Sequence, residues 1–235
     1  MTNEARAAFE SELEIFNEEV RTLGQYLGAF ATINEQYNAR AAVRVLMQET
    51  PWFWDATLTA LRAGIYITLG RIFDNNTPHS VARLLKVAKS DVSIFAPSAV
   101  MARHRLKMTT SNPEEKQRSD SGAEVGLYQP DIEDFNKIQR DLRAQRKVFM
   151  QKHAEIRHKW FAHREHTKEQ VSELFLQADI AGVQEIAAFL SSLQSALWNA
   201  YHNGSKLVTD PLRFQADSQI IVTSDAKKLF EKIAP

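Results

Sequence analysis

One short stretch of the chain, HAEIRHKWFAHREH at residues 153–166, concentrates side chains that can act on phosphate esters. It holds four histidines and two arginines within fourteen residues. His158 follows Arg157 directly, and five residues separate Arg157 from His163. An arginine neutralises a phosphate and holds it in a fixed fork, and a histidine carries a proton near neutral pH. Together these side chains are a minimal set for cleaving RNA without a metal ion.

The spacing of Arg157 and His163 limits how both can reach one ligand. On a straight helix they lie about 120° apart around the axis and ~9 Å apart along it. A break in the helix would relax this limit, and Thr167 and Gln170 form a capping box that favours a new helix start after His166. Alternatively, a second copy of the chain across a two-fold axis would bring the side chains of two helices into one cleft.

The composition predicts a mostly helical fold around this stretch. The chain has 235 residues, of which 44% are apolar and 25% charged, as in an ordinary soluble protein with one good-sized core. Only eight residues are glycine, which favours helices over a turn-rich β fold. Cysteine is absent, which excludes disulfides, thiolate catalysis and zinc–thiolate sites.

Apolar periodicity and capping residues predict the individual elements. Apolar residues recur every three or four positions over residues 4–38, as in a long amphipathic helix. Thr50 as the cap and Pro51 at the first helical position predict a second long helix over residues 51–74, apolar on most faces and therefore central. A helix is expected to start at Asp131, with Asp134 in a capping-box arrangement, and to run into the histidine-rich stretch. Further helices are expected over residues 39–48, 80–88, 168–176, 180–201 and 225–233. A short strand is expected at residues 220–222. We therefore expect an all-α, up-down helical bundle of about five to seven helices.

The polar run at residues 109–126 has almost nothing to bury, and we expect a mobile loop inside the domain there. The expected organisation is one bundle over residues 1–204, ended by Asn203 and Gly204, and a C-terminal extension over residues 205–235.

Charge is distributed unevenly along a chain whose net charge is zero. Residues 1–35 contain seven acidic residues and two arginines, whereas residues 137–168 contain ten Lys or Arg and three acidic residues. A neutral protein can therefore offer a basic face. The chain shows neither a signal peptide nor an apolar run long enough to cross a bilayer, so a cytoplasmic protein without a membrane partner is expected.

The Arg157-x5-His163 motif, with the polar residue His158 after the arginine, resembles the signature of the HEPN superfamily of helical bundles. That signature is an arginine, four to six residues, and a histidine. The surrounding IRHKWFAH is similar to the abortive-infection (Abi U-type) branch of the superfamily. So is LGRIFD at Leu69–Asp74, before a loop and a short helix with paired leucines. The resemblance covers most of residues 5–203.

The resemblance implies a metal-independent endoribonuclease, commonly a homodimer, in toxin or phage-defence systems with an antitoxin protein as a further partner. His163 would be the general acid or base, and Arg157 would neutralise charge on the phosphate. His158 would orient the phosphate or substitute as proton carrier. RNA-binding residues would be Lys159 and Arg164, which hold the flanking backbone, and Arg71 if it points into the cleft.

Less specific interpretations remain open for the same stretch. Its charges could form only a solvated face, as could the charges of Arg140, Arg143 and Lys147, which share a face of the preceding helix. His163 and His166 have a usable metal-ligand spacing, but no suitable acidic residue completes a set, so neither a metal nor a cofactor is expected. A catalytically silent HEPN-like module that binds RNA, a nucleotide or a protein is the main alternative, and a plain helical interaction protein is another.

Several further residues are expected to serve structure. The aromatic residues are expected to be core or dimer contacts, not platforms on which bases stack: Trp52, Trp54, Trp160, Phe161 and Trp198. The basic run from Arg103 to Arg105 is expected to be merely exposed. Arg71 and Asp74, three residues apart, could pair along one helix.

Overall fold

The computed structural model describes residues 3–75, 77–108, 126–152, 180–211 and 217–233. Within these ranges the chain forms eight α-helices and one 3-10 helix, η1, and no β-strand. The elements are α1 (Asn3–Ala39), α2 (Ala41–Glu49), α3 (Pro51–Phe73), α4 (Val81–Ser90), η1 (Val92–Phe95), α5 (Pro97–Met108), α7 (Ile132–Lys152), α9 (Ile180–Asn203) and α10 (Asp217–Ile233). The all-α helical bundle predicted from the sequence is confirmed.

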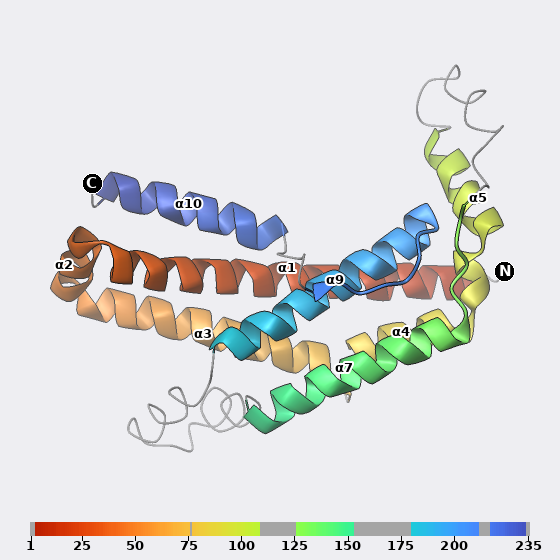
Figure 1. Cartoon of the computed structure of the whole chain (residues 1–235), viewed down its shortest axis with the longest axis horizontal. Helices are drawn as coiled ribbons and strands as arrows, with labels where there is room; N and C mark the ends of the chain where they lie inside the picture. Colours follow the sequence, from red (N-terminus) through yellow and green to blue (C-terminus); the bar gives the residue numbers. More distant parts are fainter. Residues whose placement is uncertain (1–2, 76, 109–125, 153–179, 212–216, 234–235) are drawn as a thin grey trace.

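Helix α1 is the longest element and the axis of the bundle (Figure 1). Helices α3, α4, α9 and α10 all pack against it. Its apolar residues are spaced by three or four and form a continuous buried stripe: Phe9, Leu13, Phe16, Val20, Leu23, Leu27, Phe30 and Ile33. Burial of this stripe, more than helix propensity, stabilises so long a helix.

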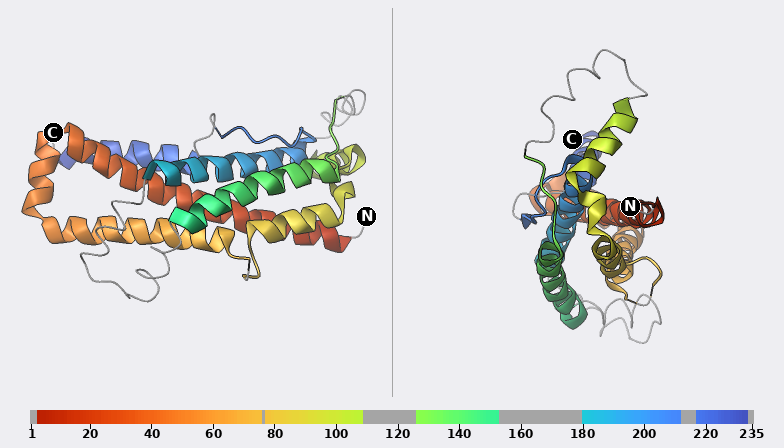
Figure 2. Two further views of the ribbon diagram at one scale, coloured as in Figure 1. Left: turned by 60° about the horizontal axis from the view of Figure 1, so that its bottom comes forward. Right: turned by 90° about the vertical axis from the view of Figure 1, so that its right-hand side faces the viewer.

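Helix α2 closes one end of the bundle between α1 and α3, as the left view of Figure 2 shows. Pro51 occupies the first turn of α3 as predicted. Thr50 does not cap α3, however, because its hydroxyl donates to the carbonyl oxygen of Leu46 at 2.8 Å. Thr50 therefore closes the C-terminus of α2, and the predicted side-chain cap of α3 is wrong.

Local capping explains where α4 and α7 begin. The hydroxyl of Ser80 accepts a hydrogen bond from the backbone N–H of Arg83 and caps α4. Asp131 and Asp134 form a reciprocal capping box, in which the Asp134 N–H donates to Asp131 Oδ1 at 2.9 Å and the Asp131 N–H donates to Asp134 Oδ2 at 3.1 Å. This arrangement was predicted, and it satisfies two N–H groups that helix geometry leaves without intrahelical partners.

The C-terminal segment differs from its prediction. Residues 220–222, expected as a short strand, lie inside α10, which starts at Asp217 instead of residue 225. A lone strand here would have left its backbone polar groups unpaired, whereas a helix pairs them internally. Helix α10 packs along α1, and its Phe230 stacks on Trp54 of α3 with ring centroids 5.9 Å apart. It therefore buries apolar surface against the bundle.

In the part of the chain that the structure describes, no helix combines the length and apolar character needed to span a bilayer. The predicted loop at 109–126 falls, apart from Gly126, outside the described ranges. The predicted helix at 168–176 and the capping box of Thr167 and Gln170 lie outside them as well.

Candidate functional site

The residues predicted for catalysis, Arg157, His158 and His163, and the RNA contacts Lys159 and Arg164 lie outside the described ranges. Their mutual geometry therefore stays a prediction. The structure does place the two helices that flank them, since α7 ends at Lys152 and α9 begins at Ile180.

Both flanking helices are anchored in the core. Near the end of α7, Phe149 is buried and stacks on Phe73 of α3, with ring centroids 5.3 Å apart. Near the start of α9, Val183 and Ile186 are fully buried. The two helices that flank the predicted motif in the sequence are therefore both anchored in the core of the bundle.

Arg71, the predicted RNA contact within the described ranges, forms an ion pair with Glu19 of α1. Its Nε donates to Glu19 Oε1 and its Nη2 donates to Glu19 Oε2, both at 2.8 Å. The hydrogen bond to Glu19 raises the pKa of Arg71. The partner is thus on a neighbouring helix, whereas the spacing along α3 had suggested Asp74. The guanidinium stays about half exposed.

A groove of about 530 Å³ runs between α4 and α7. Four of its lining residues are cationic: Arg83 and Lys86 on α4, and Arg143 and Arg146 on α7. No aspartate or glutamate of the described ranges lines it. The rest of the lining is neutral, partly polar and partly apolar, and Ser80 and Ala82 place the positive end of α4 beside it. We call it the α4–α7 groove.

The walls of the α4–α7 groove are joined by specific hydrogen bonds. The ammonium group of Lys89 on α4 donates to Asn136 Oδ1 at 2.7 Å and to Gln139 Oε1 at 3.1 Å, both on α7. The Nε of Arg146 donates to the carbonyl oxygen of Phe73 at 3.1 Å, which ties α7 to the end of α3. These bonds fix how far apart the two cationic helix faces stand.

Arg83 is positioned by a buried carboxylate. Its Nε donates to Glu12 Oε1 at 2.8 Å, and the Glu12 side chain is only 8% exposed. His79 Nδ1 lies 3.3 Å from both oxygens of the same carboxylate. The bond to Glu12 uses one of the five N–H donors of the guanidinium, so others remain for a ligand.

The sequence had indicated only part of this groove. Arg140, Arg143 and Lys147 were grouped on one helical face, but Gln139, Leu142, Arg143 and Arg146 are the residues of α7 that line the groove. Arg140 instead pairs with Glu133 at 3.0 Å. The α4 contribution was missed, although the three-residue spacing of Arg83, Lys86 and Lys89 was a signal for a basic face on that helix.

The prediction of an exposed basic spot at residues 103–105 is wrong for Arg103. This side chain is 4% exposed, and its guanidinium donates to the carbonyl oxygens of Ile94 and Tyr201 and lies 3.8 Å from the centre of the Tyr201 ring. Burial lowers its pKa. Because Tyr201 lies in the last turn of α9, Arg103 satisfies a carbonyl group there that lacks an intrahelical partner. Arg103 therefore serves structure.

The aromatic residues divide between core and surface. Trp54 is buried against Phe230, as expected of a core residue. Trp52 and Phe53 are 84% and 63% exposed, so they are not core residues of this chain. Trp198 is partly exposed beside the ring of His202.

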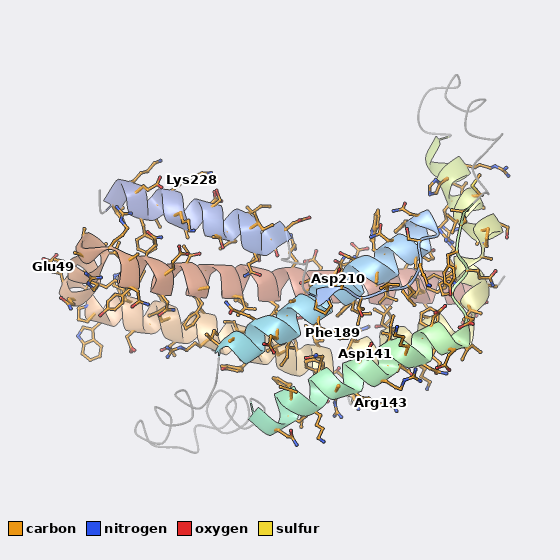
Figure 3. All side chains as sticks on the ribbon, in the orientation of Figure 1. Glu49, Asp141, Arg143, Phe189, Asp210 and Lys228 are labelled. Carbon is orange, nitrogen blue, oxygen red and sulfur yellow. The ribbon has the colours of Figure 1, made fainter. Side chains whose placement is uncertain are left out.

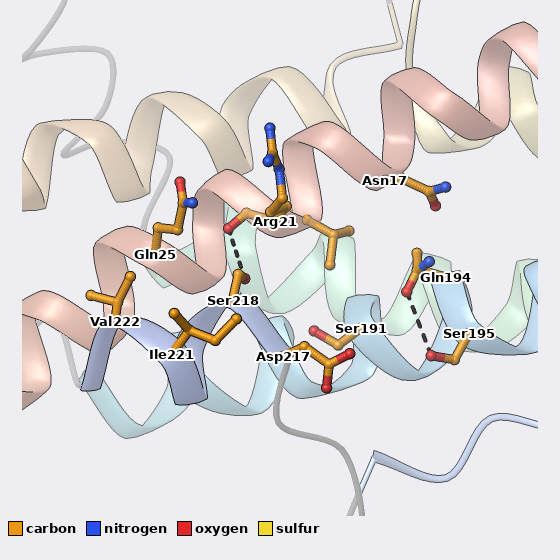
Figure 4. A pocket seen from close by; sticks show the side chains of 11 residues that line it. Asn17, Arg21, Gln25, Ser191, Gln194, Ser195, Asp217, Ser218, Ile221 and Val222 are labelled. Carbon is orange, nitrogen blue, oxygen red and sulfur yellow. Dashed lines mark hydrogen bonds between the residues drawn. The ribbon is translucent and has the colours of Figure 1, made fainter. Parts of the chain in front are cut away.

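A second pocket, of about 410 Å³, lies where the start of α10 meets α1 and α9 (Figure 4). The hydroxyl of Ser218 closes one side by donating to the carbonyl oxygen of Arg21 at 3.0 Å. The lining is mostly neutral, with hydroxyl and amide groups, and Arg21 is balanced by Asp217. It lacks the excess positive charge of the α4–α7 groove.

Among the described residues, no group of three or more His, Asp or Glu side chains is arranged to hold a metal ion. The pair His163 and His166, considered as metal ligands from their spacing, lies outside those residues.

Comparisons with known protein families match this chain to a family of helical proteins. The model of the HEPN family described as AbiU2 matches residues 3–223, which is nearly the whole chain. The comparison with curated proteins found no match, and neither did the comparison with solved structures.

Proposed function

The chain belongs to the AbiU2 family of HEPN proteins, and we propose that it is a metal-independent endoribonuclease of a toxin or phage-defence system. The observation that carries the proposal is the Arg157-x5-His163 motif, located in the sequence between two helices of a bundle that the family model matches almost throughout. The basic α4–α7 groove, with one wall on the helix that precedes the motif, supports it further.

In the proposed reaction, the ribose 2′-OH attacks the adjacent phosphorus. The bond from phosphorus to the 5′ oxygen breaks, which leaves a 2′,3′-cyclic phosphate on one product and a 5′-OH on the other. His163 removes the proton of the 2′-OH or supplies one to the leaving oxygen. Arg157 neutralises the charge that grows on the phosphate, and His158 orients the phosphate or replaces His163 as proton carrier.

A homodimer is part of the proposal because one straight helix would separate Arg157 from His163 by about 120° around its axis. Two copies related by a two-fold axis would place the residues of both chains in one cleft. An antitoxin protein that restrains the activity is the further partner proposed. Lys159, Arg164 and Arg71 would hold the RNA backbone on either side of the cut.

The proposal is tested with purified full-length protein and single-stranded RNA in excess EDTA. Cleavage is expected, and mass spectrometry should find 2′,3′-cyclic phosphate and 5′-OH ends. Cleavage that needs a divalent cation, or that leaves 3′-OH and 5′-phosphate ends, would contradict the mechanism. If RNA is bound and never cut, the chain is a catalytically silent RNA-binding module, a function that the cationic groove also favours.

A further inference from the structure

We propose that the α4–α7 groove binds the sugar–phosphate backbone of single-stranded RNA, away from the bond that is cut. This inference rests on the proposed function, because it assigns the path of that substrate. It uses only residues that the structure describes. Helices α4 and α7 lie side by side in Figure 1, and Figure 3 labels Arg143 on α7.

The charge of the groove favours a polyanion. Glu12 offsets the charge of Arg83 through its 2.8 Å contact. Within the described residues, Lys86, Arg143 and Arg146 have no such acidic partner, so about three positive charges face one groove unopposed. Asp141 is on α7 as well, but it projects from another face and does not line the groove. Clustered cations with so little opposing charge are the usual signature of phosphate binding.

The lining favours a backbone over a base. No aromatic side chain of the described ranges lines the groove, so it offers no aromatic platform on which a nucleobase could stack. The neutral lining groups, such as Thr77, Asn75 and Gln139, can exchange hydrogen bonds with phosphate oxygens and ribose hydroxyls. A volume of about 530 Å³ accommodates a phosphate with its sugar. Binding should therefore depend little on sequence.

The groove is also pre-organised and well placed. Lys89 joins its walls, and Arg83 and Arg146 are held by Glu12 and by the carbonyl oxygen of Phe73. Little side-chain entropy is therefore lost by these two arginines when a ligand binds. Arg146 lies six residues before the end of α7, about 9 Å along the helix. An RNA strand held there is guided along α7 toward the segment that follows it.

The inference is tested by fluorescence anisotropy with the full-length chain and a short fluorescein-labelled RNA that carries 2′-O-methyl groups. This RNA cannot be cut, because its 2′ oxygens cannot attack the phosphate. The test variant is Lys86→Gln with Arg143→Gln, two exposed side chains whose replacement leaves the core intact. The control is Arg140→Gln, which removes an exposed cation from the same helix but outside the groove.

We expect the double variant to bind roughly tenfold more weakly, and the salt dependence of log affinity to fall by about 0.7 for each lost phosphate contact. Arg140→Gln should bind like the wild type. An unchanged affinity and salt slope in the double variant, or an equal loss in Arg140→Gln, would overturn the assignment. So would tight displacement of the RNA by a mononucleotide, which would indicate a nucleotide pocket instead of a backbone path.

Cleavage and binding measurements together separate the role of the groove from the ribonuclease activity. If wild type and double variant cut unmodified RNA equally fast, the ribonuclease proposal is supported and the assignment of the groove is contradicted. If RNA binds through the groove but is never cut, the assignment of the groove is supported and the ribonuclease proposal is contradicted.

Discussion

Arg71 on α3 and Glu19 on α1 meet through two parallel hydrogen bonds of 2.8 Å. The pair bridges two helices that are far apart in the sequence, and it holds the guanidinium in one orientation at the surface of the α1–α3 interface. Because the guanidinium is about half exposed, water screens the pair, and its contribution to stability is at most about 1 kcal/mol.

This pair allows the two roles of Arg71 to be separated. Arg71→Met and Glu19→Gln break the same ion pair, so both should lower the free energy of unfolding by a similar small amount in urea titrations. Only Arg71→Met removes the positive charge, and it alone should weaken RNA binding. If neither variant changes RNA binding, Arg71 serves structure only and its predicted RNA contact is wrong.

Arg103 should be important for stability and unimportant for RNA. Arg103→Ala leaves the carbonyl oxygens of Ile94 and Tyr201 without their buried donor, which should cost about 2 kcal/mol of unfolding free energy. Arg105→Ala, which changes an exposed arginine of the same helix, should cost much less. Chemical denaturation of both variants measures the difference. Equal costs would contradict the helix-capping role assigned to Arg103.

The docking of α10 on α1 depends on the absence of a side chain at Gly28. A Cβ atom at this position would lie 2.9 Å from the backbone oxygen of Gln219, which cannot move without moving α10. Gly28→Leu should therefore speed hydrogen exchange of residues 217–233. The control is Ala31→Leu on the same helix, which borders an open groove of about 540 Å³ and should leave that exchange unchanged.

Alkaline pH should destabilise the protein through Tyr201. Burial, and then the hydrogen bond that its hydroxyl donates to Glu10, raise the pKa of Tyr201 from 10.0 to about 12. The folded state therefore favours the neutral phenol. The contribution of this preference to the free energy of unfolding is complete below pH 10 and is lost as pH rises from 10 to about 12.

Tyr201→Phe should reduce the loss of stability at alkaline pH, which is measured as the urea midpoint of unfolding at a series of pH values. Burial also raises the pKa of Tyr66 to about 12, so part of the loss should persist until Tyr66→Phe is added. At neutral pH Tyr201→Phe should be slightly less stable than wild type, because Glu10 loses a donor. An alkaline profile identical to that of the wild type would show that Tyr201 ionises normally.

The features that the sequence predicted well are local. The three- and four-residue spacing of α1, the capping box of Asp131 and Asp134, and Gly204 after α9 with its positive φ of 59° each follow from a few neighbouring residues. Helix periodicity and capping preferences describe interactions at this range, so a single sequence reveals them.

The features that were missed depend on contacts between distant segments. Nothing near Arg103 shows that its guanidinium ends at Tyr201, and nothing near Arg71 points to Glu19. The residues 220–222 were taken for a strand because the surface of α1 that favours a helix there lies far away in the chain. The α4–α7 groove likewise requires two helices separated by about fifty residues, so of its four cationic residues only Arg143 belonged to a basic face predicted from the sequence.

In the proposed reaction His163 carries a proton, and the cleavage rates of three proteins test this role. The rate of cleavage of single-stranded RNA in EDTA is measured for the wild type, for His163→Ala and for His166→Ala, which removes a histidine of the same stretch outside the motif. We predict that the wild type and His166→Ala cut the RNA, and that His163→Ala does not while keeping the wild-type circular dichroism spectrum. Undiminished cleavage by a folded His163→Ala protein would contradict this role.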